Sequence, residues 1–207
     1  MKTKILLLVL VVMTVFGNAK ASVREAWLMM PDSLLPYLNK NQRLELLELR
    51  DMKVKAEVKN LLNGNTVMDT LTTNYLSLTL SPSSSMQMKV LPGADGDSVI
   101  CVVRTFCGPA AESTVELYRS DWTLQRTLPL AQEGVDAFVS KPDTMNLTKF
   151  NELKAFLKPL LVAATLSPSE DSLSLEVSVP LASKADRKAV EAILLQRKVN
   201  WTGSMFK

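Results

Sequence analysis

The segment between Tyr75 and Trp122 holds four consecutive β-strand patterns, and it limits the fold of this chain more than any other feature. Three of the four alternate apolar with polar residues and are bounded by turn-forming residues: Tyr75–Leu80, Met86–Val90 and Thr114–Tyr118. Because alternation with a period of two places one set of side chains on each face, these strands are expected to be half buried. The remaining pattern is continuously apolar over Val99–Val103, which is typical of a central strand covered on both faces.

Helical patterns precede this predicted sheet. After a lead-in over residues 22–28, Pro31 and Asp32 favour the start of a short helix. A second helix is predicted over about Asn41–Arg50, where apolar spacing places some side chains against the core and others in solvent. The inward set is Leu44 and Leu47, with Leu46 as a weaker addition, and the outward set is Arg43, Glu45 and Glu48. The next segment, Met52–Leu62, fits both a strand and a continued helix, and the pattern leaves both open.

The region after the predicted sheet mixes irregular and regular patterns. Leu128–Pro142 shows little periodicity and is expected to be an irregular connection. Asn146 is placed to cap a helix that runs to about Lys158, and Ser183 is placed to cap another that runs to about Gln196. A hairpin lies between these helices and a short strand follows them, with predicted bounds of Leu161–Leu166, Ser172–Val179 and Val199–Thr202.

The order of these elements predicts the fold class. Helices and strands come in blocks without regular βαβ alternation, which argues against a parallel sheet. We therefore predict an α+β fold, an antiparallel β-meander with helices packed on one face. The segment Thr-Leu-Ser-Pro-Ser occurs at residues 79–83 and again at 165–169. This repeat favours two related helix-plus-hairpin halves, 22–127 and 143–207, within a single domain over 22–207. Chance recurrence is the alternative, because Ser-Pro turns are common.

The first 21 residues have the three parts of a secretory signal peptide. Lys2 and Lys4 precede an apolar run over residues 5–16, and residues 19–21 form an Ala-x-Ala cleavage site. The apolar run is about half of the roughly 20 residues that a membrane-spanning helix needs. We expect cleavage after Ala21 and export to the periplasm or the extracellular space, with no transmembrane segment left. A short membrane anchor is the alternative interpretation.

Composition excludes several classes of function. The leader holds three of the 24 basic residues and none of the 21 acidic ones, so the remaining chain has equal numbers of each and gives no reason to expect nucleic-acid binding. The sequence has no histidine, which excludes Ser-His-Asp and Cys-His catalysis and imidazole metal sites. Asp95-Gly96-Asp97 is predicted to be a tight turn, because the other ligands of an EF-hand loop are absent. No cofactor or metal is expected.

Two cysteines, Cys101 and Cys107, fall on the same predicted strand. At about 3.3 Å per residue, a regular strand separates them by roughly 20 Å. A disulfide requires Cα atoms within about 7 Å, so the two are not expected to pair with each other. We predict buried, unpaired thiols, and a bulge near Gly108 or an intermolecular bridge is the alternative.

Several turn, cap and core segments share one resemblance. They are Met30–Leu38, Arg43–Leu46, Asp95–Ser98 leading to Gly108-Pro109, Leu166–Pro168 and Trp201. Together they are similar to a secreted family of unknown function from Bacteroidales. The resemblance implies a Gram-negative host, and hence the periplasm or the outer surface. It implies no catalytic residue, because that family has no assigned activity.

The function that these observations favour is a non-enzymatic binding or interaction module for an unknown protein or apolar ligand. Its candidate anchors are Trp27, Trp122 and Trp201, because tryptophan is enriched where binding energy concentrates. The alternative, favoured for at least two of the three, is a place in the core. A carrier of an apolar ligand is the second hypothesis, supported by the many methionines and leucines.

A carboxylate-based glycan hydrolase is the third and least favoured hypothesis. It requires two acids that converge in a cleft. The acids near predicted strand ends are Asp69, Asp95, Asp97, Glu112 and Asp121. Acids at strand ends are usually solvated turn residues. Converging carboxyl groups would favour the hydrolase, an apolar tunnel would favour the carrier, and neither would favour the module.

Overall fold

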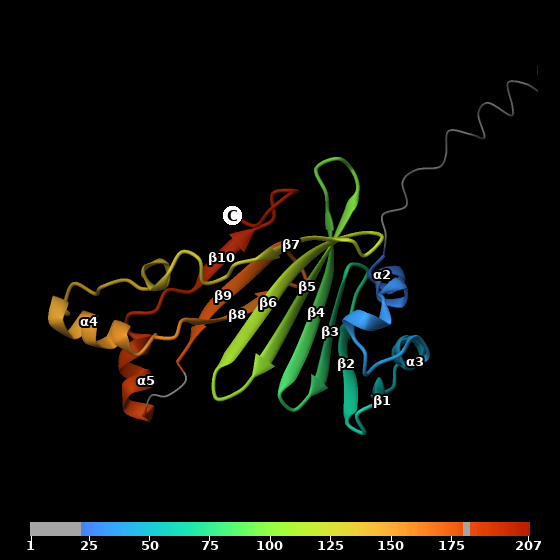
Figure 1. The fold of residues 1–207 in the computed structure, drawn as a ribbon, viewed down its shortest axis with the longest axis horizontal. Helices are drawn as coiled ribbons and strands as arrows, with labels where there is room; N and C mark the ends of the chain where they lie inside the picture. Colours follow the sequence, from blue (N-terminus) through green and yellow to red (C-terminus); the bar gives the residue numbers. More distant parts are fainter. Residues whose placement is uncertain (1–21, 180–182) are drawn as a thin grey trace, which may run out of the picture.

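The structure is a computed structural model that describes residues 22–179 and 183–207, so the predicted leader lies outside the described residues (Figure 1). Its larger sheet has seven antiparallel strands in sequence order: β1 (Glu57–Lys59), β2 (Asn65–Leu71), β3 (Tyr75–Ser81), β4 (Ser84–Pro92), β5 (Ser98–Cys107), β6 (Ala111–Arg119) and β7 (Leu124–Leu128). Its smaller antiparallel sheet has the order β10-β9-β8: β8 (Leu161–Leu166), β9 (Ser172–Ser178) and β10 (Arg197–Asn200). The predicted α+β class and antiparallel meander are confirmed.

The helices lie in two groups at opposite ends of the molecule (Figure 1). The first group is α2 (Val23–Met29), the 3₁₀ turn η1 (Asp32–Leu34) and α3 (Lys40–Asp51). The second group is the 3₁₀ turn η2 (Val135–Phe138), α4 (Leu147–Ala155) and α5 (Lys184–Glu191). The α4 and α5 helices share a small apolar cluster of their own beyond the smaller sheet.

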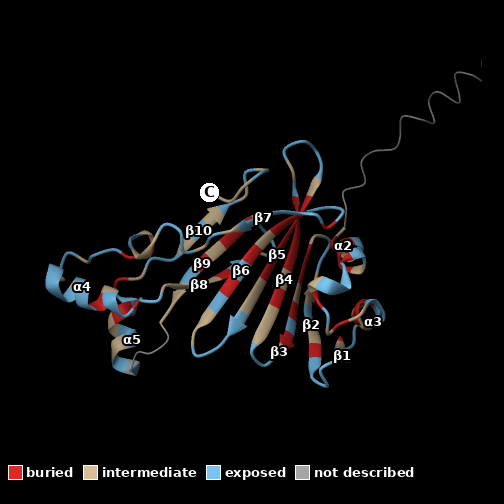
Figure 2. Ribbon diagram, in the orientation of Figure 1, coloured by how far each residue is buried: buried red, intermediate tan, exposed pale blue. Residues whose placement is uncertain are grey.

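The central strands of the larger sheet are covered on both faces, and Figure 2 shows buried residues concentrated there. Helices α2 and α3 cover one face, where Trp27 and Leu47 share an apolar cluster with Met88 of β4. The smaller sheet covers the other face, where Leu173 shares a second cluster with Val103 of β5. The continuous apolar run of β5 is therefore explained by burial on both of its faces.

The predicted lead-in over residues 22–28 is wrong, because helix α2 occupies it. Ser22 is the N-cap, and its hydroxyl accepts a hydrogen bond from the Glu25 N–H at 3.2 Å. The Glu25 carboxylate accepts one from the Ser22 N–H at 2.9 Å. This capping box satisfies two donors reciprocally and is a recognisable sequence pattern. The helix predicted at Pro31 is only the single turn η1.

Helix α3 confirms the second predicted helix, but its inward face differs from the predicted one. Arg43 is 1% exposed and Leu44 is 43% exposed. The Arg43 guanidinium donates to the Met30 carbonyl at 2.7 Å and to the Leu38 carbonyl at 3.2 Å, and it pairs with the Asp32 carboxylate. Because main-chain carbonyls from a preceding loop satisfy the charge, the arginine can face the core, which helical spacing alone does not reveal.

The segment Met52–Leu62, left open by the sequence, divides into a helix cap, a loop and strand β1. The Lys53 N–H donates to the Arg50 carbonyl at 3.0 Å, and the Val54 N–H donates to the Leu49 carbonyl at 3.2 Å. These two bonds form a Schellman motif, which ends the helix. Lys53 adopts a φ of 57° at the position where glycine is usual, so the sequence lacks the ordinary signal.

Both C-terminal helices begin where predicted and end earlier, at Ala155 and Glu191. Strand β8 has the predicted bounds, β9 ends one residue early, and β10 lies two residues before its predicted position. Asn146 caps α4 by accepting from the Lys149 N–H at 2.8 Å, and Ser183 caps α5. The predicted irregular connection Leu128–Pro142 contains η2, whose Phe138 is buried in the apolar cluster between the two sheets. Strand β7, immediately before this connection, was not predicted.

The thiols of Cys101 and Cys107 are both free, as predicted. Cys101 lies in the core, where burial raises the pKa of its thiol to about 12. Cys107 lies at the exposed end of β5, so the prediction that it is buried is wrong.

Lys89 of β4 joins the two sheets. Its side chain is fully buried, and Nζ donates to the Ser167 carbonyl at 2.8 Å and to the Glu170 carbonyl at 2.6 Å. The Asp171 carboxylate lies 3.3 Å from the same nitrogen. These acceptors belong to the β8–β9 turn. The second copy of the repeated segment runs from the end of β8 into this turn, and the first copy runs from the end of β3 into the β3–β4 turn. A buried ammonium needs such acceptors, so this contact fixes the turn against the larger sheet.

Candidate functional site

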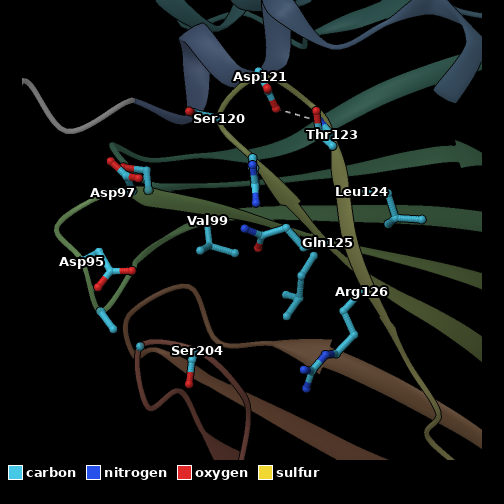
Figure 3. Close-up of a pocket in the computed structure, with 16 residues that line it drawn as sticks. Asp95, Asp97, Val99, Ser120, Asp121, Thr123, Leu124, Gln125, Arg126 and Ser204 are labelled. Carbon is cyan, nitrogen blue, oxygen red and sulfur yellow. Dashed lines mark hydrogen bonds between the residues drawn. The ribbon is translucent and has the colours of Figure 1, made fainter.

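A polar cleft of about 810 Å³ lies at one end of the larger sheet (Figure 3). The β4–β5 loop, the β6–β7 turn, strand β7 and the C-terminal segment form its walls. Val99 and Leu117, which belong to the buried cluster between the sheets, lie at its base. The charged residues that line it are Asp95, Asp97, Arg119, Asp121 and Arg126.

Strand β7 contributes consecutive residues to the cleft because its pairing with β6 is irregular. Leu117 lies opposite Arg126, whereas Tyr118 lies opposite Leu124, so Gln125 is an additional residue in the ladder. Such a bulge re-aims side chains and is common beside functional sites. Figure 3 shows Gln125 and Arg126 extending from β7 into the cleft.

The β6–β7 turn holds Asp121 at the cleft through the residue that follows it. Trp122 has a φ of 67°, a left-handed conformation that is unfavourable for a bulky side chain. Its indole N–H donates to the Ala26 carbonyl of α2 at 3.1 Å, and its ring packs on Tyr118 with the centroids 5.3 Å apart. These contacts hold the strained Trp122 against helix α2, and the same turn places Asp121 in the lining of the cleft.

The C-terminal wall is held by Trp201. Its indole N–H donates to the Pro92 carbonyl at 2.7 Å, and its ring packs on Phe206 with the centroids 5.1 Å apart. Close by, the Ala94 N–H donates to the Gly203 carbonyl at 3.0 Å. Gly203 has a φ of 94°, and a side chain on it would contact Ala94. The C-terminal segment is therefore fitted closely to the β4–β5 loop.

The charges in the cleft are exposed and largely unpaired. Within residues 22–179 and 183–207, no ion pair or side-chain hydrogen bond involves Asp95, Asp97 or Arg126. Asp121 accepts from the Thr123 N–H at 2.9 Å, and this backbone hydrogen bond holds the pKa of Asp121 below its ordinary value. Nearby Arg119 lowers the same pKa further. The cleft therefore offers ionised groups of both signs to a ligand.

Three of the five acids that sequence reasoning considered come together in this cleft. Asp95, Asp97 and Asp121 line it. Asp69 lies on β2, where it accepts from the Thr79 hydroxyl at 2.9 Å, and Glu112 lies at the far end of β6. Gln125 and Arg126 were missed because β7 has no alternating pattern that would place its side chains, and Arg119 was missed because it follows the last residue of the β6 pattern.

Two of the three tryptophans proposed as anchors lie in the core. Trp27 and Trp122 belong to the cluster under α2 and α3, and the indole N–H of Trp27 donates to the Arg43 carbonyl at 3.0 Å. Trp201 is half buried and packs against the cluster between the sheets. The core alternative thus fits two of them, whereas Trp201 supports the C-terminal segment, which lines the cleft through Gly203 and Ser204.

The described residues contain no group of three His, Cys, Asp or Glu side chains that could hold a metal ion. A second, smaller pocket of about 410 Å³ lies beside the β4–β5 loop and has Leu91 and Asp171 in its lining. Over the part of the chain that the structure describes, no helix has the length and apolar character needed to cross a bilayer.

The fold and the cleft define a small α+β protein with a polar groove at the end of a two-sheet core. Residues 16–206 match the family described as "Protein of unknown function (DUF3256)", and the chain belongs to that family. No curated protein matches the chain. It is similar in structure to a domain of an uncharacterized protein from Porphyromonas gingivalis W83, with a TM-score of 0.68 and 22% identity over 89% of this chain and 96% of that one. At this identity the likeness concerns the fold.

Proposed function

We propose that the chain, after loss of its leader, is a non-enzymatic binding module of the periplasm or cell exterior that holds a polar ligand in the cleft. The observation that carries this proposal is the unpaired charge of Asp95, Asp97 and Arg126 around a cleft of about 810 Å³. Because these groups have no ion-pair partner among the described residues, they are available for charge-assisted hydrogen bonds to a ligand. The polar lining supports a polar ligand over the apolar cargo of a carrier.

Exposure of the three aspartates supports binding over hydrolysis. A glycosidase needs one carboxylic acid whose pKa is raised, and burial is the usual means. Asp95, Asp97 and Asp121 are all exposed, and the pKa of Asp121 is lowered. We expect no turnover of ester, peptide or glycoside substrates.

Because these three acids line one cleft, a glycan hydrolase is the second candidate. Glycan hydrolysis by the native chain that is abolished by both Asp97→Asn and Asp121→Asn would replace the binding module with this enzyme.

Site-specific photo-crosslinking in the native envelope tests the proposed site. A photoreactive residue in place of Ser204, in the cleft wall, is expected to form an adduct that Arg126→Ala weakens. The same replacement of Asn151, exposed on α4 at the other end of the molecule, is the control and should form none. Mass spectrometry of the adduct identifies its chemical class. A lipid adduct would favour the carrier, and equal labelling at both positions would reject the cleft as the site.

A further inference from the structure

At three of the four sheet edges among the described residues, other segments form hydrogen bonds with the edge strand. At β1, the Gln42 side chain donates to the Lys59 carbonyl at 2.7 Å. At β8, the Ala164 N–H donates to the Ser113 hydroxyl at 2.9 Å, and the Leu166 N–H donates to Gln87 Oε1 at 2.7 Å. At β10, Asn200 exchanges two backbone hydrogen bonds with Lys207, at 2.6 and 2.9 Å. Proteins generally close sheet edges in this way, because an open edge pairs with other strands.

The fourth edge, at β7, is open. The Arg119 N–H donates to the Thr123 carbonyl at 2.9 Å, so every second residue of β6 counted from Arg119 directs its backbone groups toward β7. These residues, Val115 and Leu117, lie opposite Leu128 and Arg126. Thr127, between Arg126 and Leu128, must therefore direct its N–H and carbonyl away from β6. No other described residue forms a hydrogen bond with its backbone, and the strand is exposed.

We propose that the ligand of the cleft is an extended peptide segment of a partner protein, which adds as a strand to the open edge of β7. This inference rests on the proposed function and names the ligand class of the same site. The peptide residue opposite Thr127 would exchange two backbone hydrogen bonds with it, as in other cases of strand addition. The neighbouring residue would lie opposite Arg126, on the face that lines the cleft. Because Arg126 has no ion-pair partner among the described residues, an acidic residue is favoured there.

A second copy of the chain is a poorer occupant of this edge. In a symmetric antiparallel pair centred on Arg126, the two copies of Arg126 would lie directly opposite each other. In a pair centred on Thr127, they would be diagonal neighbours on one face, about 7–8 Å apart. Like charges at these positions are destabilising, and Pro129 prevents a longer strand that could move them apart. Charge complementarity thus selects an acidic partner strand.

Fluorescence anisotropy with a labelled heptapeptide, Thr-Val-Thr-Glu-Thr-Val-Thr, tests the proposal. Thr127→Pro removes the outward N–H and keeps the ladder to β6, so we expect its affinity for the peptide to fall about tenfold or more. Thr127→Ala keeps the N–H and is the matched control, with affinity within about twofold of the native chain. Arg126→Glu, which leaves the backbone unchanged, should reverse the preference in favour of a peptide with lysine in place of the central glutamate.

Each of the other outcomes overturns the proposal. Equal binding by Thr127→Pro and Thr127→Ala would show that the edge of β7 is not used. A dimer in sedimentation that Thr127→Pro converts to a monomer would assign the edge to a second copy. Absence of peptide binding by the native chain, together with a cleft adduct of another chemical class at Ser204, would reject the peptide and leave the proposed binding site standing.

Discussion

At the scale of single residues, two cations are buried among the described residues, and main-chain carbonyls and a carboxylate surround the terminal nitrogens of each. Arg43 is held by carbonyls from the segment between α2 and α3, and Lys89 by carbonyls of the β8–β9 turn. A buried charge costs several kcal/mol unless it is hydrogen-bonded, so each of these residues selects one conformation for the loop that surrounds it.

Replacement of Lys89 by methionine should destabilise the chain by about 1–3 kcal/mol, because the Ser167 and Glu170 carbonyls lose their donor. Lys198→Met is the matched control: Lys198 pairs with the side chain of the same Glu170 at the exposed surface, and its loss should cost about 1 kcal/mol or less. Urea unfolding monitored by circular dichroism measures both. An unchanged midpoint for Lys89→Met would show that water replaces the ammonium.

The two thiols should differ in reactivity. Burial raises the pKa of Cys101 to about 12, so at neutral pH its reactive thiolate is scarce and inaccessible, whereas Cys107 is exposed. Alkylation of the folded chain without reductant is expected to label Cys107 alone, and labelling after unfolding should reach both residues. Peptide mapping by mass spectrometry assigns the labels. No label in the unfolded monomer would mean that the two cysteines are joined.

At the scale of elements, the sequence predicts those strands that carry an apolar pattern, alternating or continuous, and misses the strand that carries neither. The predicted patterns lie within β3, β4, β5 and β6, although β4 is buried at four consecutive residues, Met88–Leu91. Strand β7 is exposed at nearly every residue, so no period marks it. The cleft was missed partly because β7, one of its walls, has no period. It was also missed because its walls come from four segments, and only the fold places Asp95 and Arg126 in one cleft.

The C-cap of α3 offers a test of local strain. Lys53 occupies a left-handed position that costs a residue with a side chain about 1 kcal/mol relative to glycine. Lys53→Gly should therefore raise the free energy of unfolding by up to about 1 kcal/mol. Lys55→Gly, in the loop that follows and without a positive φ, is the control and should be neutral or destabilising. Thermal denaturation compares the variants, and a lower midpoint for Lys53→Gly would contradict this account.

At the scale of the whole molecule, the larger sheet has two dissimilar coverings, helices on one face and a second sheet on the other. Helix α2 begins at Val23, and its N-cap, Ser22, immediately follows the predicted cleavage site and supplies its N–H and side chain to the capping box. The predicted mature chain would therefore start at the N-cap of a helix and lose none of the described elements.

Mass spectrometry of the protein from its native envelope should find Ser22 at the N-terminus. Removal of residues 1–21 would leave equal numbers of basic and acidic residues. A mutation of Ala21 to a bulky residue, such as Ala21→Trp, should block processing because the cleavage site requires small residues. An intact Met1 on the native protein would contradict both the predicted leader and the proposed location.

The position of Lys89 along the chain has a consequence for synthesis. Its carbonyl partners lie 78 and 81 residues later, so strands β4, β5 and β6 leave the ribosome well before the turn that receives the ammonium. Until residues 167–171 emerge, the ammonium must stay hydrated, and the sheet face that carries it cannot become dry. We therefore expect the hydrated ammonium to disfavour burial of this face by any other segment until residues 167–171 supply its acceptors.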